Sequence, residues 1–162
     1  MRRSPIEQRA FNVVSRTLGS LHTWVYRKSE GRIGSHFTGG APVMLLTTRG
    51  RKSGKQRTSP LLYMRDGDRI ITVASKGGSA KHPAWYLNLL QTPDVIVQIG
   101  NERISMRAGA ATPEQKAKYW PRLIAVYPPY QSYQARTDRD IPVVILRPAS
   151  NGASNGSNGS HA

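Results

Sequence analysis

The sequence contains no cysteine, which excludes disulfide bonds, thiolate zinc sites and a cysteine nucleophile. This absence is consistent with a reducing compartment. Histidine is sparse as well, and the four histidines form no H-x-x-H or H-E-x-x-H pair. We therefore expect no metal site.

Acidic residues are scarce relative to basic ones. Nine Asp and Glu stand against 24 Lys and Arg, which gives a formal net charge of +15. Twelve of the basic residues lie among the first 57 positions, where Glu7 and Glu30 are the only acids. This imbalance predicts an anionic partner, and nucleic acid, anionic lipid and a multiply charged cofactor are the alternatives.

The usual catalytic motifs are also absent from the sequence. It has no P-loop, and none of its few acids is suitably paired near a histidine. The pattern G-x-S-x-G occurs only at residues 152–156, inside the Asn-, Gly- and Ser-rich tail, where no strand-to-helix elbow is predicted. A hydrolase with its own nucleophile is not expected. If the chain is an enzyme, a bound cofactor carries the chemistry.

No apolar run approaches the roughly 20 residues that a membrane-spanning helix needs, and the N-terminus has no secretory signal pattern. We expect a cytoplasmic protein. Residues 1–28 form one expected unit, because apolar residues recur at spacings of three and four over residues 5–28, with arginines between them. This amphipathic helix either packs on the core or lies peripherally on the inner face of an anionic membrane.

Residues 29–148 have the pattern of a single α+β domain. Strands are predicted over 42–48, 59–65, 69–75, 94–100, 102–108 and 141–147, with helices over 82–91 and from Pro113, capped by Thr112. Hairpin turns are predicted at 66–68 and at 100–101, so the strands are expected to pair antiparallel and to close into a small barrel. Residues 149–162 are Asn, Gly, Ser and Ala for the most part and predict a solvated tail.

The first candidate site is the segment T-T-R-G-R-K-S-G-K-Q-R-T-S-P-L, residues 47–61. Five cations fall within nine positions, interleaved with Gly, Ser and Thr: Arg49, Arg51, Lys52, Lys55 and Arg57. Such a loop can offer backbone N–H groups, hydroxyls and fixed charges to a polyanion. The alternative is a solvated, charged hairpin.

The second candidate site spans residues 74–86, where a predicted strand ends in Ser-Lys-Gly-Gly and leads into a helix. Glycine lets a ligand approach the backbone closely, and a helix N-terminus favours anions. Trp85 can wall a flat heterocycle, or Trp85 and Tyr86 can simply pack the helix onto the sheet.

A third candidate is a cluster of tyrosines, Tyr127, Tyr130 and Tyr133, after a helix-ending Pro pair. Phenols of this kind fill volume or donate a proton beside a reacting carbon. The charged residues that follow, between Arg136 and Asp140, are predicted to form local ion pairs of small energy.

Together these segments resemble the deazaflavin-dependent nitroreductase family, whose members use coenzyme F420. The matching stretches are L-L-T-T-R-G-R-K-S-G-K-Q-R-T-S-P-L, A-S-K-G-G-S-A-K-H-P-A-W-Y-L-N-L and Y-W-P-R-L-I-A-V-Y-P-P-Y-Q-S-Y-Q-A-R-T-D-R-D-I-P-V-V. The resemblance covers about residues 20–148. It implies a split β-barrel of about six mainly antiparallel strands with flanking helices, similar to the flavin reductases.

The resemblance also implies site residues. The phosphate and oligoglutamate tail of F420 would be held by Arg51, Lys52, Ser53 and Arg57, with the site lined by Thr58, Ser59, Pro60, Leu61 and Leu62. The deazaflavin ring would lie along Val73, Ala74, Ser75 and Lys76 and be closed over by Ala84, Trp85, Tyr86, Leu87 and Asn88. Tyr130 and the nearby Ser75 would be catalytic, and Tyr130 would contact the cofactor and orient or protonate the substrate. Tyr127 and Tyr133 would join Tyr130 in binding the substrate and shape its pocket.

By this resemblance the activity is hydride transfer from reduced F420 to a quinone, a nitroaromatic or an activated enone. One departure concerns Leu62, because close relatives have a tyrosine there and this chain has its tyrosine one step later, at Tyr63. A one-residue step in a strand moves a side chain to the opposite face. The resemblance links nitroimidazole reduction to pocket tyrosines, so this departure favours quinones over nitroimidazoles as acceptors. The alternatives are an FMN-binding enzyme on the same barrel and a basic nucleic-acid-binding module, although no nucleic-acid recognition motif is present.

Overall fold

The computed structural model describes residues 40–150. The predicted N-terminal helix and nearly all of the predicted tail lie outside these residues and stay predictions. In chain order the elements are β1 (Val43–Arg49), β2 (Gln56–Leu62), β3 (Met64–Asp66), β4 (Arg69–Val73), the 3-10 turn η1 (Lys76–Gly78), α2 (Ala84–Gln91), β5 (Asp94–Ile99), β6 (Glu102–Ala110), α3 (Pro113–Val126), α4 (Pro129–Ala135) and β7 (Val143–Pro148).

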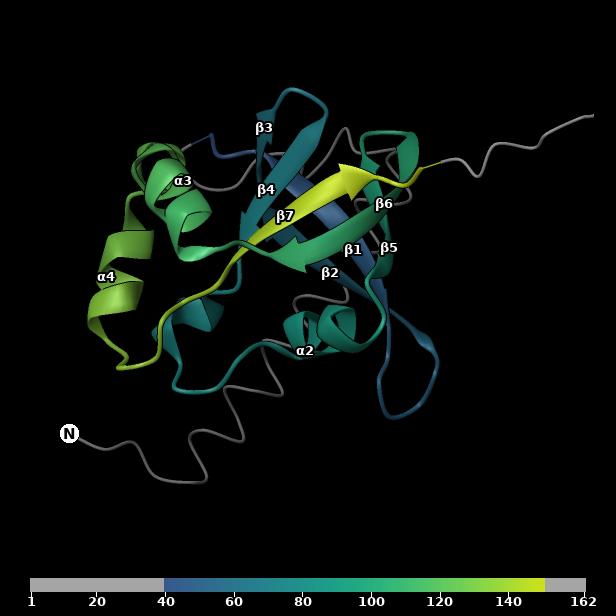
Figure 1. Ribbon diagram of the computed structural model, residues 1–162, viewed down its shortest axis with the longest axis horizontal. Helices are drawn as coiled ribbons and strands as arrows, with labels where there is room; N and C mark the ends of the chain where they lie inside the picture. The colour runs from purple at the N-terminus through teal and green to yellow at the C-terminus, as the bar shows by residue number, and fades with distance from the viewer. Residues whose placement is uncertain (1–39, 151–162) are drawn as a thin grey trace, which may run out of the picture.

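The strands form one seven-stranded antiparallel sheet in the order β2-β1-β5-β6-β7-β4-β3 (Figure 1). The two edge strands, β2 and β3, are separated in the chain by Tyr63 alone. The sheet therefore curls until its edges meet at this corner, where the Thr72 hydroxyl donates to the Leu62 carbonyl at 2.7 Å. The α+β fold with a closed antiparallel sheet is confirmed.

One predicted strand was wrong in its bounds. The structure replaces a single strand over 59–65 with β2, which starts at Gln56, and with β3, which starts after the corner at Tyr63. The Tyr63 backbone N–H donates to the Pro42 carbonyl at 3.2 Å, at the end of the β1–β2 pairing. Over residues 40–150 the sheet consequently has seven strands where six were expected.

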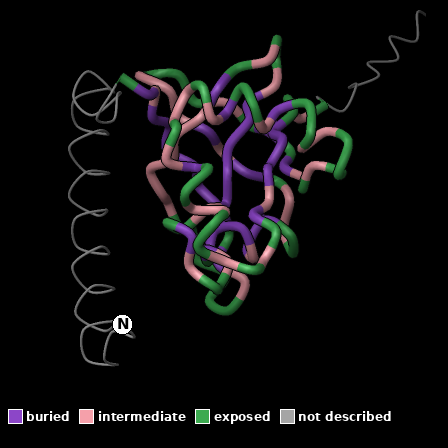
Figure 2. The backbone as a smooth tube through the Cα atoms, turned by 90° about the vertical axis from the view of Figure 1, so that its left-hand side faces the viewer, coloured by how far each residue is buried: buried purple, intermediate pink, exposed green. Residues whose placement is uncertain are grey.

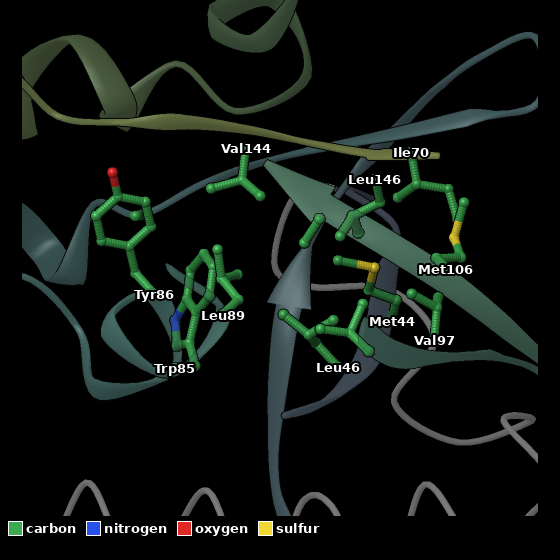
Figure 3. Packing of buried hydrophobic residues seen from close by; sticks show 13 residues of the cluster. Met44, Leu46, Ile70, Trp85, Tyr86, Leu89, Val97, Met106, Val144 and Leu146 are labelled. Carbon is green, nitrogen blue, oxygen red and sulfur yellow. The ribbon is translucent and has the colours of Figure 1, made fainter. Parts of the chain in front are cut away.

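Two hydrophobic clusters lie on opposite faces of the sheet. Strand residues alternate between them, so Val144 and Leu146 of β7 point into one cluster while Val143 and Ile145 point into the other. The first fills the barrel interior and includes residues of α2 (Figure 3). The second lies under α3 and α4, which sit together on one side of the sheet (Figure 1).

In Figure 2 the buried segments of the backbone run through the middle of the molecule, and the exposed segments lie at its periphery. The turn predictions are confirmed, because Asp66 pairs with Arg69 and Ile99 pairs with Glu102.

The helices begin where the sequence indicates. α2 follows Pro83, and Thr112 caps α3 through a reciprocal pair of hydrogen bonds with Gln115, at 3.2 and 2.9 Å. α4 was not predicted, because the Pro pair before it was interpreted only as a helix stop. Over residues 40–150, no helix has the length and apolar character needed to cross a bilayer.

Candidate functional site

The basic segment forms the connection between β1 and β2. Two backbone hydrogen bonds shape it, from the Gly50 N–H to the Lys55 carbonyl and from the Gly54 N–H to the Gly50 carbonyl, both 2.8 Å. Lys52, Lys55 and Arg57 are exposed. This donor set of cations and hydroxyls on a fixed loop suits phosphate and carboxylate groups.

Asn88 of α2 anchors this loop. Its side-chain oxygen accepts from the Arg51 backbone N–H at 3.1 Å and from the Arg51 guanidinium at 3.3 Å. Its amide nitrogen donates to the Thr48 hydroxyl at 3.1 Å. The buried Asn88 amide thus holds the loop onto α2, which brings the first two sequence segments together.

β2 continues from the loop along the edge of the sheet. Thr58 shares a 2.8 Å hydroxyl–hydroxyl hydrogen bond with Thr47 of β1, and Ser59 to Leu62 are half-buried. Leu62 packs on the cluster under α3 and α4, which contains Tyr130, whereas Tyr63 packs on the barrel interior. The opposite orientation expected for these two neighbours is confirmed.

The second segment turns sharply where β4 ends. Val73 and Ala74 are buried, and Ser75 leads into η1. Lys76 has φ of 45°, a left-handed conformation that costs a non-glycine residue about 1–2 kcal/mol. Such strain persists only where neighbouring contacts enforce it.

The side chain of Arg139 supplies those contacts. Its Nε donates to the Ser79 carbonyl at 2.7 Å, and one terminal nitrogen donates to the carbonyls of Ser75 at 2.8 Å and Ala74 at 3.3 Å. The other terminal nitrogen lies 3.3 Å from His82 Nδ1. The prediction that Arg139 forms an ion pair with a neighbouring acid is therefore wrong, because its side chain contacts backbone carbonyls and His82 instead.

The neighbouring Asp140 makes its ion pair with Lys116 of α3, a residue distant in sequence. That ion pair is also not the local one that was expected.

Trp85 and Tyr86 both belong to the barrel-interior cluster, with exposed fractions of 8% and 7% (Figure 3). Their rings meet edge to face, with centroids 6.3 Å apart. In this arrangement both aromatics join α2 to the sheet, and contact between Trp85 and a cofactor stays a prediction. Ala84 is exposed and Leu87 is half-buried on the same helix.

The three tyrosines do cluster, around the start of α4. Tyr127 and Tyr133 share a 3.1 Å hydrogen bond between their hydroxyls, and the Tyr130 ring lies 5.1 Å from that of Tyr127. The hydrogen bond to Tyr133, together with burial, raises the pKa of Tyr127 to about 12. Burial and the two neighbouring phenols also raise the pKa of Tyr130, so its O–H stays protonated across the physiological range.

The tyrosine helix lies directly against η1. A Cβ atom built on Gly78 would come within 2.6 Å of the Tyr133 carbonyl oxygen, so the two backbones are in contact. The second and third sequence segments are therefore adjacent, and Asn88 joins the first to the second. Sequence reasoning missed the anchoring roles of Asn88 and Arg139, whose contacts span 37 to 65 residues.

A family model described as F420H(2)-dependent quinone reductase matches residues 18–148. The chain belongs to this family. An F420H(2)-dependent quinone reductase of Mycobacterium tuberculosis is 42% identical over 129 residues, which are 78% of this chain and 87% of that protein. A second protein of that organism, named for the same activity, is 45% identical over 117 residues, covering 72% and 98%.

Solved structures agree with membership of the quinone reductase family. An F420-H2 dependent reductase, FDR-A, matches with a TM-score of 0.61 and 42% identity over 65% of this chain and 94% of that chain. A structure described as a domain-swapped dimer matches with a TM-score of 0.62 and 38% identity, covering 77% and 98%. Coenzyme F420 is the cofactor of this family, and the split β-barrel is its fold.

Proposed function

We propose that this protein transfers a hydride from reduced F420 to a quinone. The family match over residues 18–148 carries this proposal. The structure supports it by placing a cationic loop, a glycine-rich turn and a cluster of phenols around the buried Tyr130 on neighbouring elements.

The β1–β2 loop fits the anionic end of F420. We assign the phosphate and glutamate tail to Arg51, Lys52, Ser53 and Arg57, because cations and a hydroxyl on an exposed, hydrogen-bonded loop match those groups chemically. Arg51 has a second role, since its contacts with Asn88 shape the loop. Lys52 is therefore the cleaner residue with which to test tail binding.

The remaining ligand contacts follow the chain. We assign the ring of the cofactor to the segment from Val73 to Lys76, next to α2, and the β2 residues Thr58 to Leu62 to the wall of the site. Reduced F420 supplies the hydride when bound. The protein's part is to hold the two reactants in register and to exclude water, and correct placement can contribute about 7–11 kcal/mol to lowering the barrier.

Quinone reduction to the hydroquinone consumes one hydride and one proton. We assign Tyr130 as the donor of a hydrogen bond or proton to the quinone oxygen, with Ser75 nearby and Tyr127 and Tyr133 shaping the pocket. The support is its position in the phenol cluster. Its raised pKa keeps the phenol protonated, which favours donation of a hydrogen bond over transfer of the proton itself.

Other acceptors and a membrane location are further parts of the proposal. Nitroaromatics and activated enones are electron-poor acceptors of the same kind. The basic, apolar-periodic segment at residues 5–28 would attach the enzyme peripherally to anionic membranes, where lipid-soluble quinones reside. Co-sedimentation with acidic but not neutral liposomes tests this, and failure with acidic lipid removes it.

The deciding experiment is a tryptophan-fluorescence titration with F420 beside FMN. Saturable quenching by F420 alone, followed by turnover of a soluble quinone with reduced F420, is expected. Binding of FMN alone would instead indicate a flavin enzyme, and binding of neither would turn attention to nucleic acid.

Two variants then test the site. Lys52→Gln should weaken F420 binding while leaving the melting temperature unchanged. Tyr130→Phe should bind F420 normally and lose quinone turnover. Unchanged turnover in Tyr130→Phe would remove the donor role.

A further inference from the structure

Arg139 occupies an unusual position for a charged residue. It is half-buried between the segment 74–79 and α2, and its guanidinium contacts three backbone carbonyls and one imidazole. No carboxylate within residues 40–150 forms an ion pair with it. Its charge is compensated by carbonyl dipoles, so its contacts order backbone rather than neutralise an acid.

The imidazole contact fixes a tautomer. Arginine has five N–H donors and no acceptor, so His82 Nδ1 accepts the hydrogen bond and the ring proton sits on Nε2. Burial, together with the charge of Arg139, lowers the pKa of His82 and keeps the ring neutral. Arg139 therefore holds both ends of the connection between β4 and α2.

The backbone of Arg139 is tied to the tyrosine helix. Its carbonyl accepts from the Gln134 side-chain amide of α4 at 2.8 Å, and the same side chain accepts from the Ile141 N–H at 2.9 Å. A continuous set of hydrogen bonds thus runs from α4 through Gln134 and Arg139 to the carbonyls of Ala74 and Ser75.

The geometry of the peptide unit shows how the hydrogen bonds from Arg139 orient the backbone of the segment 74–76. The C=O and N–H of a trans peptide unit point in opposite directions, and the described residues contain no cis bond. By drawing the carbonyls of Ala74 and Ser75 toward itself, Arg139 turns the next N–H groups, those of Ser75 and Lys76, to the other side. The strained Lys76 conformation lies at this point.

We propose that Arg139 is a positioning residue of the reductase site, which presents the Ser75 and Lys76 N–H groups to the bound cofactor and fixes that segment relative to α4 and Tyr130. This rests on the proposed assignment of segment 73–76 to the cofactor ring. Arg139 touches neither reactant and acts through the backbone that it holds.

Lysine cannot replace this arrangement, because three donors on one ammonium cannot reach acceptors spread around a planar guanidinium. In Arg139→Lys and Arg139→Gln we expect about 10- to 100-fold lower kcat/KM, the loss that small misplacement of reacting groups produces. F420 affinity, measured by fluorescence in the absence of turnover, should fall as well. Arg139→Ala should regain affinity on addition of guanidinium at a non-denaturing concentration.

Arg107→Gln is the matched control, because Arg107 makes an exposed ion pair with Asp94 on another part of the sheet. It should retain wild-type affinity and kcat/KM. Lower melting temperatures of the Arg139 variants with unchanged affinity and kcat/KM would overturn the proposal, since the arginine would then act on stability alone. If Arg139→Gln fails to fold, Arg139→Lys decides. Failure of the wild-type protein to bind F420 would instead refute the proposed function.

Discussion

Adding one methyl group at Gly78 tests how closely η1 packs on α4. Gly78 has φ of 78°, and a Cβ there would lie 2.6 Å from the Tyr133 carbonyl oxygen and 3.0 Å from its Cα. Gly77→Ala is the control, because Gly77 has φ of 61° and an added Cβ would meet no atom within 4 Å. Both variants carry the left-handed backbone penalty, and Gly78→Ala alone carries the clash.

The magnitudes separate the two variants. A left-handed alanine costs about 1–2 kcal/mol, and forcing a methyl group into packed backbone adds about 1–3 kcal/mol. Gly77→Ala should therefore lower the free energy of unfolding by about 1–2 kcal/mol and Gly78→Ala by about 2–5 kcal/mol.

Urea denaturation of both proteins measures these values. Gly78→Ala should also lose more quinone turnover, because the added methyl group pushes Tyr133 away from η1. Equal destabilisation of the two variants would refute the reasoning, since it would mean that η1 and α4 are not in contact.

Three other variants test features away from this contact. The hydrogen bond from Tyr119, followed by that from Arg122, lowers the pKa of Asp66. The carboxylate therefore stabilises the fold above its unfolded-state pKa, and this stabilisation is lost as the pH falls through the lower folded-state value. The melting-temperature difference between wild type and Asp66→Asn should shrink in acid; a constant difference would contradict this. Leu62→Tyr should place a phenol in the Tyr130 cluster and raise nitroaromatic turnover relative to quinone turnover, and an unchanged ratio would count against the pocket assignment. Asn88→Ala should lower the free energy of unfolding by about 1–3 kcal/mol in urea, because it strands buried polar groups, and should weaken F420 binding; unaltered affinity would show that the loop needs no anchor.

Much of the fold could be predicted because its signals are local. Thr112 followed by Pro113 predicts a helix start from adjacent residues alone, and the turn at Gly67 is likewise predicted from the residues next to it. α4 was missed although its tyrosines, Tyr130 and Tyr133, are three residues apart, which is a helical spacing. Pro129 was interpreted as a stop, yet proline is also favoured in the first turn of a helix, which is where it lies.

The candidate site was less accessible from the sequence. The composition of the β1–β2 loop predicts its positive charge, and the family resemblance predicts that the three segments form one site. The roles of Asn88 and Arg139 depend on contacts between residues far apart in the chain, for which no periodicity exists. The corner at Tyr63 is a similar case, because the barrel closure that breaks the strand is a property of the whole sheet.

The place of β7 has a consequence for how the protein is made. β7 follows the other strands in sequence but lies between β6 and β4 in the sheet. During synthesis the N-terminal parts of the chain emerge first. Until residues 143–148 leave the ribosome, the edges of β4 and β6 that pair with β7 therefore have no partner strand. Exposed strand edges of this kind invite pairing with other chains. A ribosome that stalls before residue 143 should therefore release an aggregation-prone fragment rather than a partly working enzyme.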